Sequence, residues 1–234
     1  MFDFTGKRVL VTGGTSGIGR AISQAFALAG ADVLALGIAC EESLPAQIQT
    51  AILDITDSDA VDQLVGGLPA LHVLVNAAGI IQRDEEFDLD IFAKVLDVNL
   101  VGAMRVCMAA HPKLMMAGGS IVNIASMLSF FGGGRVPAYS ASKGGIVQLT
   151  RSLAIAWARD HIRVNAVAPG WILTPLTEAL QKDAKRSSEL VSRTPLGRWG
   201  RAEEVTGPVL FLASPLASFI TGAVLPVDGG YSVF

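Results

Sequence analysis

Short apolar runs alternate along this chain with longer stretches in which apolar residues recur every three or four positions. The short runs have the length and β-branched content of buried strands. They are residues 8–11, 33–36, 51–53, 73–75, 120–124, 163–167 and 223–227. Strands that alternate with helices form a parallel sheet with helices on both faces, joined by right-handed crossovers. The pattern predicts an α/β fold with one doubly wound parallel sheet of about seven strands.

The first run leads directly into a glycine-rich turn and then a helix. Gly13, Gly17 and Gly19 fall in this turn, and Ile18, Ile22 and Phe26 follow at four-residue intervals on one helical face. Such a turn lets backbone approach a pyrophosphate, and free N–H groups at the helix start attract the anion. A tight turn without a ligand is the alternative interpretation.

Composition limits the classes of function. The chain has 234 residues, 51% of them hydrophobic, with 25 glycines and a net charge of −3. We expect a single domain over residues 1–234, because we find no repeat, low-complexity tract or linker. The charge gives no footprint for nucleic acid, and no apolar window is long enough to favour a membrane span.

The sequence favours a cytoplasmic protein without a metal. Residues 1–6 lack the basic and apolar regions of a secretory signal. Cys40 and Cys107 are far apart and outside any paired motif, so we interpret them as free thiols in a reducing compartment. No cluster of His, Cys or carboxylates has the spacing of metal ligands.

Tyr139 and Lys143 are four residues apart, which stacks the lysine one helical turn from the tyrosine. A free tyrosine has a pKa of about 10, and a nearby ammonium favours the phenolate. The pair therefore predicts a proton-transfer group with a lowered tyrosine pKa, and Ser126 lies thirteen residues upstream. A solvated surface pair is the alternative.

Several motifs together resemble those of the short-chain dehydrogenase/reductase family. They are Thr12-Gly-Gly-Thr-Ser-Gly-Ile-Gly19, Asn76-Ala-Ala-Gly79, Asn99, Ser126, Tyr139-x-x-x-Lys143, Pro169-Gly170 and Val227-Asp-Gly-Gly230. Their order and spacing cover essentially the whole chain. The resemblance implies a Rossmann-like sheet, a nicotinamide dinucleotide cofactor, alcohol–carbonyl interconversion and a homotetramer.

The resemblance also implies residue roles. Ser126 polarises the substrate oxygen, Tyr139 exchanges the proton, Lys143 lowers the tyrosine pKa and binds the nicotinamide ribose, and Asn99 holds a relay water. For Asn99, a structural helix kink is the alternative. The implied cofactor contacts are Gly13, Thr15, Ser16, Gly17, Ile18, Gly19, Gly37, Asp54, Ile55, Asn76, Ala77, Gly79, Tyr139, Lys143, Pro169, Gly170, Ile172 and Thr174.

The end of the second strand bears on the choice of cofactor. An acidic residue there binds the ribose hydroxyls, whereas a basic residue accommodates a 2′-phosphate. Gly37 is followed by Ile38, Ala39 and Cys40, so neither signature is present, and Ser16 also supplies no cation. We therefore favour NAD(H) and keep NADP(H) as possible.

The following crossover is short. Too few residues separate Gly37 from Asp54 for the full helix that relatives carry there. Asp54 matches the position that accepts from the adenine amino group, and a helix N-cap is its alternative role.

Substrate choice rests on the variable segment of about 174–199 and on two arginines. Residues 79–83, 124–139 and 197–200 resemble the branch of the family that oxidises sugar acids, such as 2-dehydro-3-deoxy-gluconate and 2-deoxy-gluconate dehydrogenases. Arg135 could bind the substrate carboxylate, with Ser126 and Tyr139 on the reacting oxygen, and Arg83 is a second candidate. A surface ion pair is the alternative for Arg135.

Two other functions remain open. A 3-ketoacyl-thioester reductase has closely related motifs, and a non-catalytic dinucleotide-binding protein would share the fold. A hydrolase is excluded, because Ser126 is not in a G-x-S-x-G turn and the histidines follow no triad order. Apolar helices over 95–106 and 140–160 favour a helical contact between subunits, with Ile146, Leu149, Leu153 and Trp157 on one side.

Overall fold

The computed structural model describes residues 2–39 and 44–233. One seven-stranded parallel sheet has the strand order β3-β2-β1-β4-β5-β6-β9. Its strands are β1 (Arg8–Thr12), β2 (Asp32–Gly37), β3 (Ile48–Ile52), β4 (Val73–Asn76), β5 (Ser120–Ile124), β6 (Arg163–Pro169) and β9 (Val224–Val227). All seven predicted strands are present, and the predicted doubly wound parallel sheet is confirmed.

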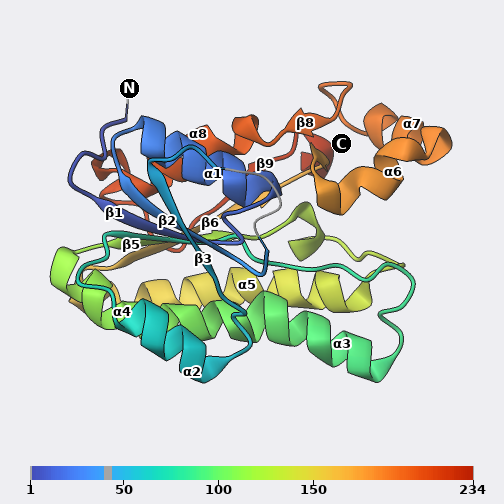
Figure 1. Cartoon of the computed structure of the whole chain (residues 1–234). Coiled ribbons are helices and arrows are strands. Elements are labelled where there is room, and N and C mark those ends of the chain that lie inside the picture. Colours follow the sequence, from blue (N-terminus) through green and yellow to red (C-terminus); the bar gives the residue numbers. More distant parts are fainter. Residues whose placement is uncertain (1, 40–43, 234) are drawn as a thin grey trace.

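Helices cover both faces of the sheet (Figure 1). Helices α1 and α8 lie on one face, and α2, α3, α4 and α5 lie on the other. The helices are α1 (Gly17–Leu28), α2 (Ser58–Val61), α3 (Leu89–Leu96), α4 (Ala103–Ala117), α5 (Pro137–Ala156), α6 (Glu178–Lys182), α7 (Ala184–Ser192) and α8 (Glu203–Ala213). Central strands are therefore apolar on both sides, as Leu10 and Val11 show by packing into opposite clusters.

The neighbouring strands β1 and β4 define the place where a ligand can bind. Strand β1 leads to α1 on one face, whereas the chain after β4 leads to α3 and α4 on the other. The strand order reverses at this point, so a crevice opens at the carboxyl ends of β1 and β4.

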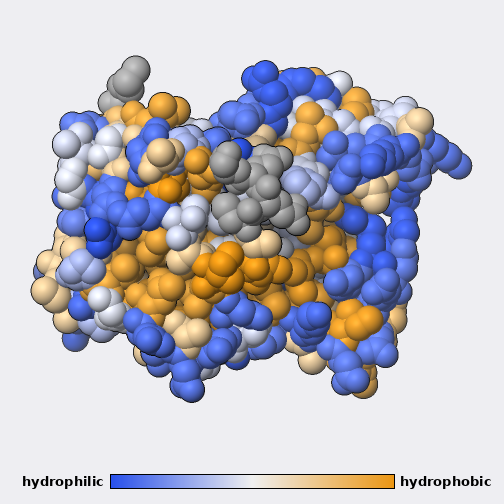
Figure 2. All heavy atoms as spheres, in the orientation of Figure 1, coloured by the Kyte–Doolittle hydropathy of each residue, from blue (hydrophilic) through white to orange (hydrophobic). Residues whose placement is uncertain are grey.

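The crossover from β2 to β3 is short, as predicted. Among its described residues, 38–39 and 44–47, none is helical. Ile38 and Ile52 are 76% and 64% exposed, and the described residues of the crossover form no helix over them. Apolar surface is visible in the middle of the molecule in the view of Figure 2.

Local features absent from the sequence pattern also occur. A two-stranded pair joins β7 (Ile172–Leu173) to β8 (Gly200–Arg201). A π-helical segment, η2 (Asp97–Gly102), joins α3 to α4 into one long helical rod.

The apolar side of α5 lies inside the molecule. Ile146 and Leu153 are buried, and Leu149 and Trp157 pack against the core clusters. These four residues therefore face the core, and the predicted contact between subunits through the two helices stays a prediction. The large apolar residues exposed on the rod are Leu89, Val101, Met108, Met115 and Met116.

Two remaining expectations concern cysteines and the membrane. Cys107 is a buried free thiol, whereas Cys40 lies outside the described residues. Within residues 2–39 and 44–233, every helix is too short or too polar to cross a membrane.

Candidate active site

A cleft of about 310 Å³ opens where the carboxyl ends of β1, β4, β5 and β6 meet. Its walls come from the glycine turn, the loop after β4, the end of β5, helix α5 and the segment after β6. The predicted cofactor residues that line it are Gly13, Ser16, Gly17, Ile18, Gly19, Ala77, Gly79, Tyr139, Lys143, Pro169, Gly170, Ile172 and Thr174.

The glycine turn has the geometry of an anion site. A Cβ on Gly19 would lie 2.1 Å from the Gly13 carbonyl oxygen, so only glycine allows the helix to start this close to the strand. Gly13 has φ of +63°, and a Cβ there would lie 2.7 Å from the Ala78 nitrogen. The N-cap residue Ser16 makes no side-chain hydrogen bond to the first turn of α1. The N–H groups of that turn can therefore bind a phosphate.

The other predicted cofactor residues, Thr15, Gly37, Asp54, Ile55 and Asn76, do not line this cleft. The Thr15 hydroxyl donates to the Ala39 carbonyl at 2.8 Å, and a Cβ on Gly37 would collide with that hydroxyl. Asn76 is buried and donates to Asn123 Oδ1 at 2.9 Å, which ties β4 to β5. Ile55 is buried, and a Cβ on Gly102 would lie 2.8 Å from the Cδ1 and Cγ1 atoms of Ile55.

Asp54 forms a local turn. Its carboxylate accepts from the Thr56 N–H at 2.9 Å and from the Thr56 hydroxyl at 2.8 Å, and these bonds lower its pKa. The alternative role as a helix N-cap was wrong, because Asp57 caps α2 by accepting from the Ala60 N–H.

Ser126, Tyr139 and Lys143 come together at one end of the cleft. Ser126 follows β5, and Tyr139 and Lys143 lie in the first two turns of α5. The Lys143 ammonium is 5.6 Å from the centre of the Tyr139 ring and donates to the Ile124 carbonyl at 2.7 Å. Because Lys143 is 5% exposed, the pair is no solvated surface contact.

The pKa of Tyr139 is raised, contrary to the predicted lowering by Lys143. Burial of the phenol is the largest cause, while the hydrogen bond with Ser126 and the Arg83 charge lower the pKa and Glu86 raises it. Burial also lowers the pKa of Lys143 to about 8. The sequence prediction considered the neighbouring charge and omitted desolvation of both groups.

Asn99 lies inside the π-helical segment and links three parts of the site. Its side-chain oxygen accepts from the Ile80 N–H at 2.8 Å, and its amide donates to the Ile80 carbonyl at 2.9 Å and to the Ser142 hydroxyl at 3.1 Å. The helix irregularity proposed as an alternative is present at this residue. Asn99 thus holds the loop after β4 against α5.

A second pocket of about 540 Å³ adjoins Ser126 and Tyr139. Part of its wall comes from α6 and α7, within the predicted variable segment of 174–199. Both candidate arginines line it. Arg135 forms an exposed ion pair with both carboxylate oxygens of Asp84, as its alternative interpretation stated.

Arg83 differs from Arg135 because it is partly buried and has no hydrogen-bond or ion-pair partner among the described residues. Burial and the charge of Arg135 lower its pKa, and the nearby Tyr139, Asp84 and Glu86 partly offset this. Two further donors of the same pocket, Trp171 Nε1 and Arg186 Nε, are buried without an acceptor in the described part of the chain. Of these groups, the partly exposed Arg83 guanidinium is the one that can bind an anion in the pocket.

Three of these residues were missed from the sequence. Trp171 and Arg186 belong to segments predicted only as a cofactor wall and a variable loop, and the tryptophan beside Pro169-Gly170 was the available signal. Glu86 is fully buried and accepts from the Tyr139 N–H at 2.8 Å. A lone acidic residue in an acidic loop carries no pattern that predicts burial.

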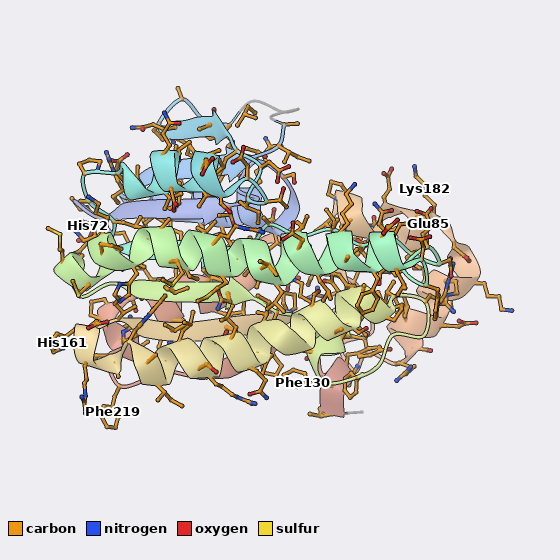
Figure 3. All side chains as sticks on the ribbon, turned by 90° about the horizontal axis from the view of Figure 1, so that it is seen from below. His72, Glu85, Phe130, His161, Lys182 and Phe219 are labelled. Carbon is orange, nitrogen blue, oxygen red and sulfur yellow. The ribbon has the colours of Figure 1, made fainter. Side chains whose placement is uncertain are left out.

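The histidines lie far from this site. Figure 3 shows His72 and His161 at one end of the molecule and Glu85 and Lys182 at the other. His111 pairs with Asp160 at 2.8 Å and also lies outside both pockets. Within the described ranges, no group of His, Cys, Asp and Glu could hold a metal ion.

Comparisons with known proteins cover nearly the whole chain. A family model described as enoyl-(acyl carrier protein) reductase matches residues 13–232. The chain is 39% identical to the 2-dehydro-3-deoxy-D-gluconate 5-dehydrogenase of Bacillus subtilis, over 98% of this chain and 96% of that protein. It is 40% identical to the 3-oxoacyl-acyl-carrier-protein reductase of Thermotoga maritima, over 96% and 97%.

A solved structure of similar fold carries a bound dinucleotide. It comes from Agrobacterium tumefaciens and contains bound NADP. It is described as a 2-deoxy-D-gluconate 3-dehydrogenase, although that activity is not established for the Agrobacterium protein. The two chains share 39% identity and a TM-score of 0.91, over 100% of this chain and 99% of the other.

Proposed function

This chain belongs to the short-chain dehydrogenase/reductase family and is an NAD(P)-dependent oxidoreductase acting on CH–OH groups, and from that premise we propose that its substrate is a sugar acid of the gluconate type. It interconverts a secondary alcohol and a ketone of that acid. The names of the Bacillus and Agrobacterium relatives support this substrate class.

The observation that carries the proposal is the unpaired guanidinium of Arg83 in the pocket beside Tyr139. An arginine without a partner in a partly buried pocket is matched by a carboxylate, which it binds through two parallel hydrogen bonds. This pairing favours an acid over a simple alcohol.

The proposed chemistry assigns one task to each residue. In the oxidation direction, the Ser126 hydroxyl holds the substrate oxygen, and Tyr139 removes its proton. Lys143 stabilises the phenolate and binds the nicotinamide ribose, and Asn99 holds the relay water. A bound nicotinamide ring supplies the hydride acceptor.

For the dinucleotide we propose a preference for NAD(H). Support comes from Ser16 and Ile38, neither of which offers a cation for a 2′-phosphate. The NADP in the Agrobacterium structure belongs to a protein of 39% identity. Titration of the protein with NADH and with NADPH, followed by nicotinamide fluorescence, tests this preference, and tighter binding of NADPH would reverse it.

A 3-ketoacyl-thioester reductase is the second candidate, favoured by the Thermotoga relative. That substrate would leave Arg83 without an anion beside the reacting carbonyl. We therefore favour a sugar acid over a ketoacyl thioester as the substrate.

A substrate screen tests the proposal. Gluconate, 2-deoxy-gluconate, 2-dehydro-3-deoxy-gluconate, the matching neutral polyols and an acetoacetyl thioester are each assayed with both dinucleotides by nicotinamide absorbance. We expect the highest kcat/KM with a sugar acid. A higher value for the thioester, or equal values for acids and neutral polyols, contradicts the proposal.

A further inference from the structure

Glu86 is a fully buried carboxylate without a basic side chain bonded to it in the described structure. Its relative exposure is 0%, and its oxygens accept two backbone hydrogen bonds. One comes from the Gln82 N–H at 2.9 Å and the other from the Tyr139 N–H at 2.8 Å. Both oxygens act as acceptors, as in an ionised carboxylate.

The N-terminus of α5 needs such an acceptor. Its N-cap residue Val136 offers no side-chain oxygen, and Pro137 at the first helical position has no N–H. The Tyr139 N–H, two residues further on, has no carbonyl partner within the helix. Glu86 satisfies it from a different part of the chain and places a negative charge at the positive end of the helix dipole.

The same carboxylate fixes the loop that carries Arg83. This loop runs from Ile80 to Asp88, and the hydrogen bond from the Gln82 N–H to Glu86 fixes its backbone at Gln82. At Asp84 the backbone N–H donates to the Arg135 carbonyl at 2.9 Å, and the Asp84 carboxylate forms an ion pair with the Arg135 guanidinium. The loop is therefore attached to the start of α5 and the residue just before it through Asp84 and Glu86, which follow Arg83, while the Gln82 bond to Glu86 closes the loop on itself.

From this geometry we propose that Glu86 is a positioning residue, which caps α5 at Tyr139 and sets the phenol hydroxyl relative to Arg83. The proposal rests on the proposed role of Tyr139 in proton transfer. A tyrosine hydroxyl lies far from its backbone nitrogen, so a small tilt of the first turn becomes a larger displacement of the reacting oxygen. Displacements of about 1 Å can reduce a rate by about 100-fold.

The charge of Glu86 has a second effect on the same phenol. The charged groups facing it are Arg83 and Glu86 from the loop and Lys143 from its own helix, while Arg135 and Asp84 neutralise each other further out. Glu86 raises the pKa of Tyr139 and Arg83 lowers it. Removing the Glu86 charge therefore moves the phenol pKa down.

The hydrogen bond can be tested without any substrate. The chain has two tyrosines, so a protein labelled with 15N-tyrosine gives two amide signals, and Y231F assigns them. We expect the Tyr139 amide proton downfield in the wild type and shifted upfield in E86Q, where one oxygen is replaced by an amide donor. E85Q is the matched control, since Glu85 is exposed at the outer surface (Figure 3). An equal Tyr139 signal in E86Q and E85Q overturns the proposal.

Kinetics then separate positioning from stability. In E86Q we expect kcat to fall by about 10- to 100-fold with an unchanged dinucleotide KM. We also expect the acid limb of the pH profile for oxidation to move to lower pH, because the Glu86 charge raises the pKa of Tyr139. E86D keeps the charge on a shorter side chain. We therefore expect its kcat to fall while the acid limb of its pH profile stays at the wild-type pH. A lower melting temperature with wild-type kcat and limb makes Glu86 structural only and overturns the proposal.

Failure of the proposed function and failure of the proposed role of Glu86 give different results. If the wild type oxidises no sugar acid, the proposed function fails, and the amide signal still decides the role of Glu86. If E86Q does not fold, E86D takes its place in the amide measurement, because the shorter stem moves the acceptor away from the Tyr139 N–H. An unchanged signal in E86D contradicts the cap.

Discussion

Two arginines of the same pocket have different surroundings. Arg135 is exposed and already paired with Asp84, whereas Arg83 is partly buried and lacks a partner among the described residues. Sequence alone favoured Arg135, because its spacing before Tyr139 is visible and the pairing with Asp84 is not. We therefore propose Arg83, the second candidate from the sequence, for the contact with the substrate carboxylate.

This difference gives a prediction for sugar-acid kinetics. R83Q should raise the KM for the acid by about 10- to 100-fold, because a charged hydrogen bond contributes about 1.5–3 kcal/mol. R135Q should change it less than about threefold, since exposed pairs contribute little. The KM of a neutral polyol is the control for both. Equal effects of the two substitutions on the acid would refute the assignment to Arg83.

Lys143 makes the stability of the protein depend on pH. Burial lowers its pKa from 10.5 to about 8, so between these values the unfolded chain holds a proton that the folded chain has released. The free energy of unfolding therefore rises with pH in this window, by at most about 3 kcal/mol.

Replacement of Lys143 by Met should remove that rise. We expect the stability difference between wild type and K143M to shift in favour of the wild type from neutral pH to about pH 9.5. Urea denaturation at both pH values measures it. A difference that stays constant across the window would show that Lys143 is not desolvated as the structure indicates.

For single residues, the sequence predicted which groups come together at the site but not the pKa shifts that burial causes there. Tyr139, Lys143 and Ser126 follow from spacing and resemblance, and the structure brings them together. Burial, which raises the pKa of Tyr139, depends on tertiary packing and has no local signature. Glu86 escaped notice for the same reason.

The joint between β1 and α1 is the element on which the dinucleotide cleft depends. Gly19 starts α1 against the backbone of Gly13, with no room for a Cβ. Gly207 in α8 is a useful contrast, because a Cβ there meets nothing within 4 Å.

G19A should therefore displace α1 and weaken NADH binding by at least about 10-fold, the factor that corresponds to 1.4 kcal/mol. G207A should leave binding unchanged and stabilise the chain by about 0.5–1 kcal/mol through helix propensity. Fluorescence titration and thermal unfolding of the two variants measure both effects. Wild-type affinity in G19A would contradict the close approach.

The elements themselves were largely predictable. Strand runs such as residues 73–75 are short, β-branched and bounded by polar turns, and all seven form. The π-helical segment was not predictable, because Asp97–Gly102 continues a helical pattern and the extra residue in the turn depends on Asn99 bonding to Ile80. Strands β7 and β8 are too short to show a period.

Over the whole molecule, the rod of α3, η2 and α4 leaves apolar side chains uncovered. Val101, Met108 and Met115 are spaced by seven residues, which places them on one face, and all three are exposed. The homotetramer implied by family resemblance would cover such a stripe, in place of the α5 residues first assigned to it.

M108E should therefore reduce the assembled mass in solution, because it places a charge in the middle of the stripe. M116E is the control, since Met116 is 79% exposed and lies off that face. Multi-angle light scattering compares the two variants with the wild type. A monomeric wild type, or an M108E protein that assembles like M116E, would contradict an interface on this face.

The order in which the cleft walls appear along the chain has a consequence for biosynthesis. Its lining runs from Gly13 to Thr177, so three quarters of the polypeptide must leave the ribosome before the last wall exists. Strand β1 must also wait for β4, because the two are neighbours in the sheet but distant in the chain. A nascent chain therefore gains nothing from a bound dinucleotide until late in translation.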